Sequence, residues 1–340
     1  MSIRSCYWLV FLMIAQGPAY SGPSIGFDYD VSIKYDDDGL SKTSTFNPPS
    51  TTTVSQTGYL SVVGSSEDDV SYEIYFSLTS GIVNDAVEVA LAKKALTDDV
   101  TLAVGKTYLN KGGWDEKNIN YATIAVSSYV ANINPLKSSD TVAQVDTNLG
   151  DLGALTIQIT NDVLNNGTNG YHNQDQRQPA GLIQWIKDYD SFTPLVQFIP
   201  YDSGHSTQMV LGLKVHTGKL TAYFDLVNDK RSNTNKETTT YNSIVADVTY
   251  EAGSLTPFFK FSTFDAKQET DQKGNATANV LDDNATTLMV GATIHGISEN
   301  FAPYFAFVNR SAKFITNGIT NETQSRNGNQ IIAGIGGSIR

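Results

Sequence analysis

The chain has 340 residues, 40% of them hydrophobic, and a formal net charge of -12. This length suffices for one large domain or two medium ones. The acidic balance argues against nucleic acid as a partner. After the first twenty residues, no apolar run approaches the roughly 20 residues that a membrane-spanning helix needs, whereas a barrel strand needs only about 9–11.

The N-terminal segment, residues 1–21, predicts a secretory signal peptide. Arg4 supplies the positive charge, residues 6–15 form an apolar core, and residues 19–21 form a small-residue cleavage site. The alternative is a short membrane anchor, although this apolar core is shorter than a bilayer span. Because Cys6 is the one cysteine, the mature chain, residues 22–340, would contain no disulfide and no thiolate metal site.

From residue 25 onward the sequence predicts a succession of short strands. Apolar and polar residues alternate in them with period two, which is typical of a half-buried β-strand. The expected strands are about sixteen in number: 25–35, 56–63, 70–79, 87–91, 101–109, 142–149, 154–160, 181–188, 194–201, 208–216, 220–228, 241–250, 255–264, 286–295, 301–310 and 331–339.

The connections between these strands alternate in length. Short turns fall near residues 65, 95, 151, 191, 218, 253 and 298, and mostly long loops cover 36–54, 110–140, 161–178, 229–240, 265–285 and 311–328. Outer-membrane barrels have this rhythm and an even strand number. Tyr and Phe residues at strand ends would form an interfacial girdle, although they are also simply favourable strand residues. We therefore predict an all-β fold, a transmembrane antiparallel β-barrel of about 16 strands.

If the apolar face of each strand meets lipid, the other face lines a lumen. This assignment places inward the acids Asp28, Asp30, Glu73, Glu88, Asp146, Asp225 and Asp247 and the bases Lys34, Lys214, Lys260 and Arg310, with Lys106 and Lys187 ambiguous. Because acids outnumber bases, the lumen would concentrate cations. The alternative is that these charges only hydrate the lumen and pair across strands.

The longest connection, Asn110–Asp140, is the leading candidate for a functional element, because a loop of this length in a compact domain is usually functional. It places two carboxylates, Asp115 and Glu116, beside Trp114. Folded inward against a basic patch, they would set a transverse field across a narrow aperture. As an external loop, the segment would carry ordinary solvated charges.

The sequence offers little for an enzyme. The histidines His172, His205, His216 and His295 are scattered, with no pair at metal-ligand spacing. No nucleophile elbow, phosphate loop or dinucleotide fingerprint occurs. We expect no enzymatic activity, no cofactor and no metal.

The segment Val142–Thr156 resembles the strand, short glycine-containing turn and strand that follow the constriction loop of general (non-specific) porins of Gram-negative outer membranes. The resemblance implies a homotrimer of sixteen-stranded barrels in the outer membrane that passes small hydrophilic solutes and ions. It also implies an inward-folded third loop, here Asn110–Asp140, with Asp115 and Glu116 facing a basic wall represented by Lys34. The further constriction candidates are Lys106, Glu73, Lys214 and Lys260. Unlike that family, the chain ends in Gly337–Arg340 rather than in an aromatic residue.

Three other readings remain. A substrate-specific outer-membrane channel would favour lumenal aromatics for sugars or an inward Arg/Lys cluster for phosphate. A secreted β-sandwich or adhesin without a pore would have to bury Asp28, Asp30 and Lys34 unpaired. An outer-membrane hydrolase would need a catalytic constellation. The leading prediction is a passive, mildly cation-selective diffusion channel.

Overall fold

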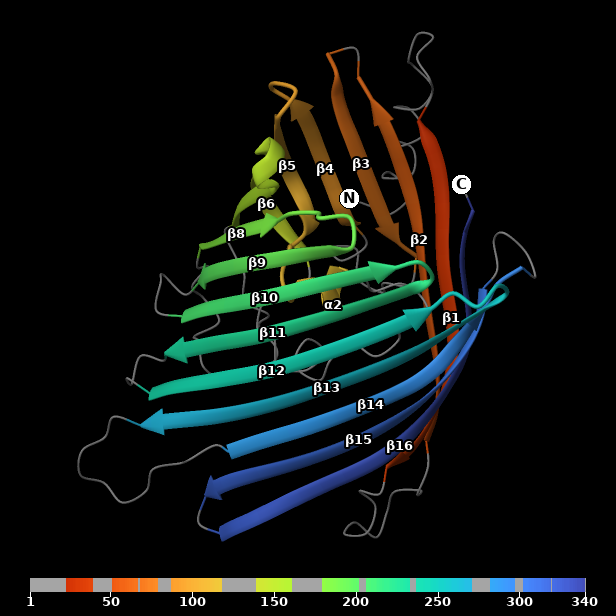
Figure 1. The fold of residues 1–340 in the computed structure, drawn as a ribbon, viewed down its shortest axis with the longest axis vertical. Coiled ribbons are helices and arrows are strands. Elements are labelled where there is room, and N and C mark those ends of the chain that lie inside the picture. The colour runs from red at the N-terminus through yellow and green to blue at the C-terminus, as the bar shows by residue number, and fades with distance from the viewer. Residues whose placement is uncertain are drawn as a thin grey trace, which may run out of the picture.

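The computed structural model describes residues 23–38, 51–66, 68–78, 87–117, 139–160, 179–201, 206–232, 237–270, 282–296, 302–318 and 320–339. The expected signal peptide lies outside these residues. The described chain is almost entirely β-strand (Figure 1). Its strands are β1 (Ser24–Asp38), β2 (Thr51–Ser65), β3 (Val70–Ser77), β4 (Val87–Ala95), β5 (Val100–Tyr108), β6 (Ser139–Asn148), β7 (Ala154–Thr160), β8 (Ala180–Ile186), β9 (Phe192–Tyr201), β10 (Ser206–Thr217), β11 (Leu220–Ser232), β12 (Glu237–Tyr250), β13 (Leu255–Thr270), β14 (Asp282–Ile294), β15 (Ala302–Gly318) and β16 (Thr320–Ile339). The helix α2 (Gly113–Lys117) follows β5, and a short 3-10 turn, Gly150–Leu152, joins β6 to β7.

The sixteen described strands form one antiparallel sheet that closes on itself. Each strand pairs with its neighbours in the sequence, and β1 pairs with both β2 and β16. The β1–β16 seam runs from Phe27 opposite Ile339 to Asp38 opposite Gly328. Closure leaves no unpaired sheet edge, which is a condition for a sheet to cross a bilayer. The predicted antiparallel barrel of about 16 strands is confirmed.

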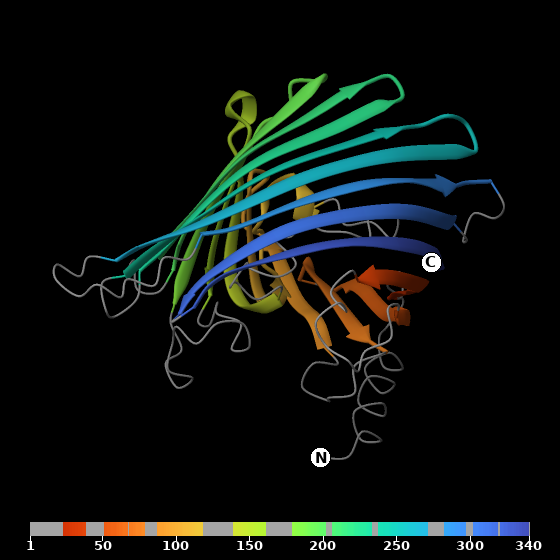
Figure 2. The ribbon, with the colours of Figure 1, turned by 90° about the horizontal axis from the view of Figure 1, so that it is seen from below.

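Several short turns depend on glycine. Gly218 joins β10 to β11 with φ 58°, and Gly253 lies between β12 and β13 with φ 67°. Tight hairpin turns favour positive φ because it matches the twist of the flanking strands, and glycine adopts it without steric cost. These turns lie at the same end of the barrel, where the backbone N–H of Glu251 donates to the carbonyl of Lys219 at 2.9 Å. Figure 2 shows the strands from below.

Two segments expected as long loops are mostly strand. In residues 229–240, β11 continues to Ser232 and β12 begins at Glu237. In residues 311–328, β15 continues to Gly318 and β16 begins at Thr320. Both segments are rich in Asn, Thr, Ser and charged residues. The alternation of apolar and polar residues on which the prediction depended is absent there, although the backbone remains paired.

The two faces of the barrel differ in polarity. On β10, Met209 and Leu211 are 48% and 46% exposed, whereas Gln208 and Val210, which alternate with them, are fully buried. On β11 the exposed Phe224 and Leu226 flank the buried Asp225. The outward set forms an exposed apolar belt, and the inward set carries most of the buried polar side chains. An apolar exterior around a polar interior is the pattern of a barrel solvated by lipid.

The pairing of β3 with β4 contains an irregularity that affects the alternation. The register shifts between Tyr75 and Phe76, so that Tyr75 pairs with Val89 but Phe76 pairs with Val87. Glu88 lies opposite this shift. Because a bulge interrupts the two-residue period, simple alternation does not determine the face on which Glu88 lies.

Candidate functional site

The described beginning of the predicted constriction loop is a short helix on the inner wall. The helix α2 packs against β9, β10 and β11 (Figure 1). Its contacts are with the inward residues of these strands, as Gly212 and Asp225 demonstrate. Residues 118–138 of the loop lie outside the described part of the chain.

Two glycines turn the chain from β5 into the helix. Gly112 and Gly113 both have φ 75°, a conformation that residues with a Cβ rarely adopt. A Cβ on Gly113 would also lie 2.6 Å from Cγ of Asp225. Glycine therefore serves both the turn and the close approach of the helix to β11.

Asp225 caps the beginning of α2. Its carboxylate accepts hydrogen bonds from the backbone N–H of Trp114 at 3.0 Å and of Asp115 at 2.6 Å. The first N–H groups of a helix have no partner within the helix, and a carboxylate there is favoured by the helix dipole. Asp225 thus satisfies two buried donors and fixes the helix to β11.

Asp115 forms a buried ion pair with Lys260 of β13. The Lys260 ammonium donates to Oδ1 of Asp115, and the two side chains are only 4% and 1% exposed, respectively. Asp115 is therefore in direct contact with the wall. Together with the Asp225 cap, this pair ties α2 to two strands of the barrel.

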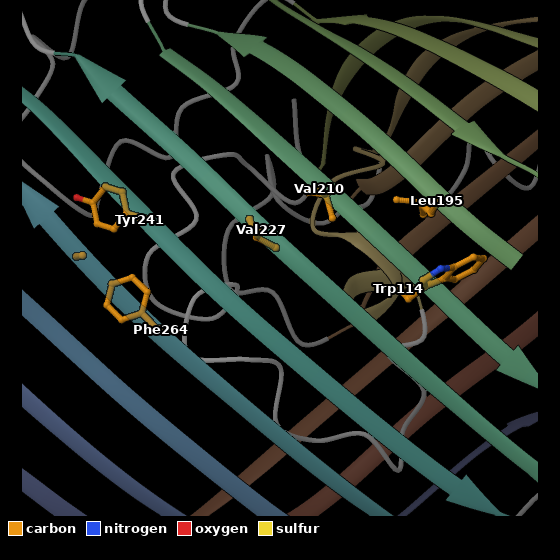
Figure 3. Packing of buried hydrophobic residues seen from close by; sticks show 7 residues of the cluster. Trp114, Leu195, Val210, Val227, Tyr241 and Phe264 are labelled. Atoms are coloured by element: carbon orange, nitrogen blue, oxygen red, sulfur yellow. The ribbon is translucent and has the colours of Figure 1, made fainter. Parts of the chain in front are cut away.

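Trp114 fills the space between the helix and the wall. It belongs to a buried cluster with Leu195, Val210 and Val227, shown in Figure 3. Its ring lies 6.3 Å from that of Tyr223, centroid to centroid. A Cβ on Gly212 would lie 2.8 Å from Cδ1 of Trp114, so a larger residue there would displace the indole.

A second polar cluster lies on the inner face of β9, β11 and β12. The Tyr201 hydroxyl donates to Oδ1 of Asp229, and Arg231 donates to Oδ2 from Nε at 2.9 Å and Nη2 at 2.7 Å. The Arg231 guanidinium lies 4.1 Å from the ring centroid of Tyr241. Asp229 is fully buried and fully engaged, so this cluster fixes neighbouring strands to one another.

The structure brings together some of the predicted site residues and not others. Asp115 and Lys260 are in contact, and Lys214 lies 5.9 Å from the ring centroid of Trp114. Glu73 instead pairs with Lys93 at 2.8 Å, between β3 and β4. The Lys106 ammonium donates to the backbone carbonyl of Val87.

Two predicted site residues have side chains outside the described part of the structure, Lys34 and Glu116. The backbone of Lys34 pairs with Ile332 of β16 and Thr53 of β2. The expectation that Lys34 faces Asp115 therefore stays a prediction, whereas the basic partner that the structure gives Asp115 is Lys260.

The roles of Asp225 and Gly212 were not predicted from the sequence. Alternation placed Asp225 on the inward face, but nothing in the sequence relates it to Trp114, from which it is separated by 111 positions. The glycine in the middle of β10 was a usable signal, because an isolated glycine inside a strand often marks a close approach of another segment.

Among the described residues, no group of three or more His, Cys, Asp or Glu side chains could hold a metal ion. In the same part of the chain, no helix is long and apolar enough to cross a bilayer.

Solved structures of bacterial outer-membrane channels share this fold. OmpT, an outer membrane protein of Vibrio cholerae, matches with a TM-score of 0.64 and 9% identity over 96% of this chain and 99% of that chain. An anion-selective porin from Comamonas acidovorans matches with a TM-score of 0.64 and 11% identity over 93% and 100%. The channel DcaP of Acinetobacter baumannii matches with a TM-score of 0.59 and 11% identity over 95% and 99%. No protein-family model matches the sequence, and neither does any curated protein.

These likenesses define a class of fold: the chain is a porin-like β-barrel. The coverage of almost the whole of each matched chain indicates that the entire barrel, rather than one part of it, has this architecture.

Proposed function

We propose that this protein is an outer-membrane porin, a water-filled channel for the passive diffusion of small hydrophilic solutes and ions. The observation that carries the proposal is the division of the closed barrel into an apolar exterior and a polar interior. Exposed Met209, Leu211 and Phe224 would be costly in water but suit lipid. The structural likeness to outer-membrane channels supports the same assignment.

The inner wall suits water and ions. Buried polar side chains recur on the inward face from β7 to β13, including Gln158, Gln184, Gln197, Gln208, Asp225, Asp229, Asp247 and Lys260. Such a surface would be unfavourable as the core of a sandwich, where each polar group needs an internal partner. A hydrated lumen supplies those partners, and this favours a channel over an adhesin without a pore.

The docked helix would narrow the lumen. In our proposal, the constriction includes Asp115 and Glu116 of the loop and Lys34, Lys106, Glu73, Lys214 and Lys260 of the wall. Because Asp115 and Lys260 neutralise each other in contact, the remaining inward acids would dominate the local potential. We infer a mild preference for cations from their excess over inward bases.

Assembly and export follow the same proposal. Residues 1–21 would be a cleaved signal peptide, residues 22–340 would insert into the lipid bilayer of the bacterial outer membrane, and the barrels would associate as a homotrimer. A trimer form of OmpT from Vibrio cholerae has been solved, with 8% identity and a TM-score of 0.62 over 93% of this chain and 99% of that chain. No enzymatic role and no cofactor enter this proposal.

The test is the single-channel conductance of refolded residues 22–340 in a planar bilayer under a salt gradient. We expect stepwise conductance with a reversal potential that favours cations. Glu73→Gln removes a half-buried inward acid and should move the reversal potential toward anions, whereas Asp98→Asn in the exposed β4–β5 turn should leave it unchanged. Protein that is folded and inserted but does not conduct would contradict the proposal.

A substrate-specific channel is the second candidate. The observation that favours it is a row of inward residues, Lys214, Tyr223 and Asp247, that combines both signs of charge with an aromatic ring on neighbouring strands.

A further inference from the structure

One row of inward residues crosses four neighbouring strands beside α2. Lys214 of β10 pairs in register with Tyr223 of β11, Tyr223 with Asp247 of β12, and Asp247 with Lys260 of β13. Adjacent strands lie about 4.8 Å apart. Lys214 and Asp247 are therefore separated by about 10 Å at the backbone, with the ring of Tyr223 between them.

Lys214 presents an ammonium group without an acidic partner. Its side chain is half-buried, and its Nζ lies 5.9 Å from the ring centroids of both Trp114 and Tyr223. Among the ion pairs of the described residues, none involves Lys214. The aromatic faces stabilise the charge only weakly at this distance, so Lys214 can receive an anionic group.

Asp247 presents the opposite charge in the same row. The residue is 4% exposed, and its Oδ1 receives no hydrogen bond within the described chain. Lys260 is its cross-strand partner but gives its ammonium to Asp115 instead. A buried carboxylate oxygen without a donor has lost the hydrogen bonds that it makes with water and is destabilising. Such an atom in a folded protein calls for a partner that comes from outside the chain.

The chemistry of that partner is constrained by the surroundings. A chelated metal is disfavoured, because no group of three or more metal-binding side chains occurs in the described residues. The row places one carboxylate oxygen that receives no hydrogen bond, Oδ1 of Asp247, and an ammonium that lacks an acidic partner on either side of a tyrosine ring. One solute can complement both ends only if it carries both charges.

We propose that Lys214, Tyr223 and Asp247 form a binding site for small zwitterions of the amino-acid or dipeptide type. The solute carboxylate pairs with the Lys214 ammonium, its ammonium group donates to Oδ1 of Asp247, and its apolar part lies against Tyr223. This inference rests on the proposed pore, because the solute must enter the lumen. A solute with a single charge satisfies one end and leaves the other unmet, so the site selects dipolar solutes over ions of the same size.

The experiment measures block of the ion current through the refolded channel by four probes of similar size. Glycylglycine is the zwitterion, N-acetylglycine the anion, glycine methylamide the cation and N-acetylglycinamide the neutral compound. We expect glycylglycine to bind about tenfold more tightly than the other three, which corresponds to one additional charge-assisted contact.

Three variants identify the residues. Lys214→Met and Asp247→Asn should each abolish the preference for glycylglycine, and the double variant should lose no more than either single variant, because both ends act on one solute. Lys93→Met, which removes an inward lysine paired with Glu73, should retain the preference.

The possible failures are distinguishable. If the wild type conducts but all four probes block its current equally, the zwitterion site is refuted and the pore stands. If Asp247→Asn retains the preference while Lys214→Met loses it, a group other than Asp247 receives the solute ammonium, and the proposal is overturned. If the folded, inserted wild type does not conduct, the proposed pore fails and the site fails with it.

Discussion

Replacing Lys260 with methionine tests whether the buried ion pair holds α2 on the wall. Methionine retains most of the side-chain volume of lysine but leaves Asp115 buried without its partner. Two unit charges about 4 Å apart interact by about 4 kcal/mol at an effective dielectric constant of about 20. Removal of one partner from a buried pair generally costs about 3–5 kcal/mol. We therefore expect Lys260→Met to destabilise the barrel by about 3–4 kcal/mol.

The assay can follow the helix directly. The sequence contains Trp8, Trp114 and Trp185, and Trp8 lies in the expected signal peptide. In a Trp185→Phe background of the mature chain, Trp114 is then the one tryptophan. Urea unfolding in lipid vesicles gives the free energy, and the emission of Trp114 in the folded state reports whether the indole has left its buried cluster. We expect a red shift in Lys260→Met.

A surface pair on the same strand supplies the control. Lys267 and Asp265 are 3.6 Å apart, and their side chains are 68% and 39% exposed. Lys267→Met should lower the free energy of unfolding by no more than about 1 kcal/mol. The double variant Asp115→Leu with Lys260→Met should recover most of the loss, because an apolar pair requires no charge to be desolvated. If the free energy of unfolding of Lys260→Met lies within about 0.5 kcal/mol of the wild-type value and the Trp114 emission is unchanged, the ion pair does not hold the helix on the wall.

The remaining predictions concern the other contacts of the inner wall. Gly212→Ala should cost about 1–3 kcal/mol in urea unfolding, because its Cβ would lie 2.8 Å from the Trp114 indole. Asp225→Asn should speed hydrogen–deuterium exchange at Trp114 and Asp115, since the amide has only one oxygen to accept their N–H groups and no charge. Arg231→Met should destabilise the barrel by about 2–4 kcal/mol, because it leaves buried Asp229 with one fewer charged partner.

Two of these variants have a matched control. For Gly212→Ala it is Gly181→Ala, where the added Cβ meets only Pro200 at 3.7 Å and should be tolerated. For Asp225→Asn it is Asp146→Asn, whose carboxylate accepts from Gln144 and Thr156 on β6 and β7 and should leave exchange in α2 unchanged. Equal effects in a variant and its control would remove the specific role assigned to that contact.

The fold was predictable because lipid imposes a strict pattern on the strands. Every outward position in the bilayer must be apolar, so strands such as β10 and β11 show a clean two-residue period. The same reasoning fails where lipid ends. The end of β15 and the beginning of β16, residues 311–328, lack the regular alternation of apolar and polar residues. This segment was expected to be a loop, but its backbone remains paired.

The site was predictable only in part, since alternation gives the face of a residue but not its distance from another segment. Asp115 and Lys260 were both expected near the constriction, yet Lys34 was the preferred partner. The choice between them depends on the path of the chain after β5, which two glycines with positive φ direct toward β11 and β13. Register places Asp247 beside Lys260, and only the three-dimensional structure shows that Lys260 bonds to Asp115 instead.

Two adjacent residues on β11 show whether the barrel encloses water and which face of the strand meets that water, since Tyr223 is inward and Phe224 is 45% exposed on the outward face. The expected mature chain lacks cysteine, so Tyr223→Cys and Phe224→Cys each introduce one thiol. A charged, water-soluble thiosulfonate reagent is added while single-channel current is recorded. We expect a stepwise loss of current for Tyr223→Cys and none for Phe224→Cys. Loss of current on modification of Phe224→Cys would contradict the assignment of faces. The absence of channels in the wild type and in both folded variants would contradict a water-filled barrel.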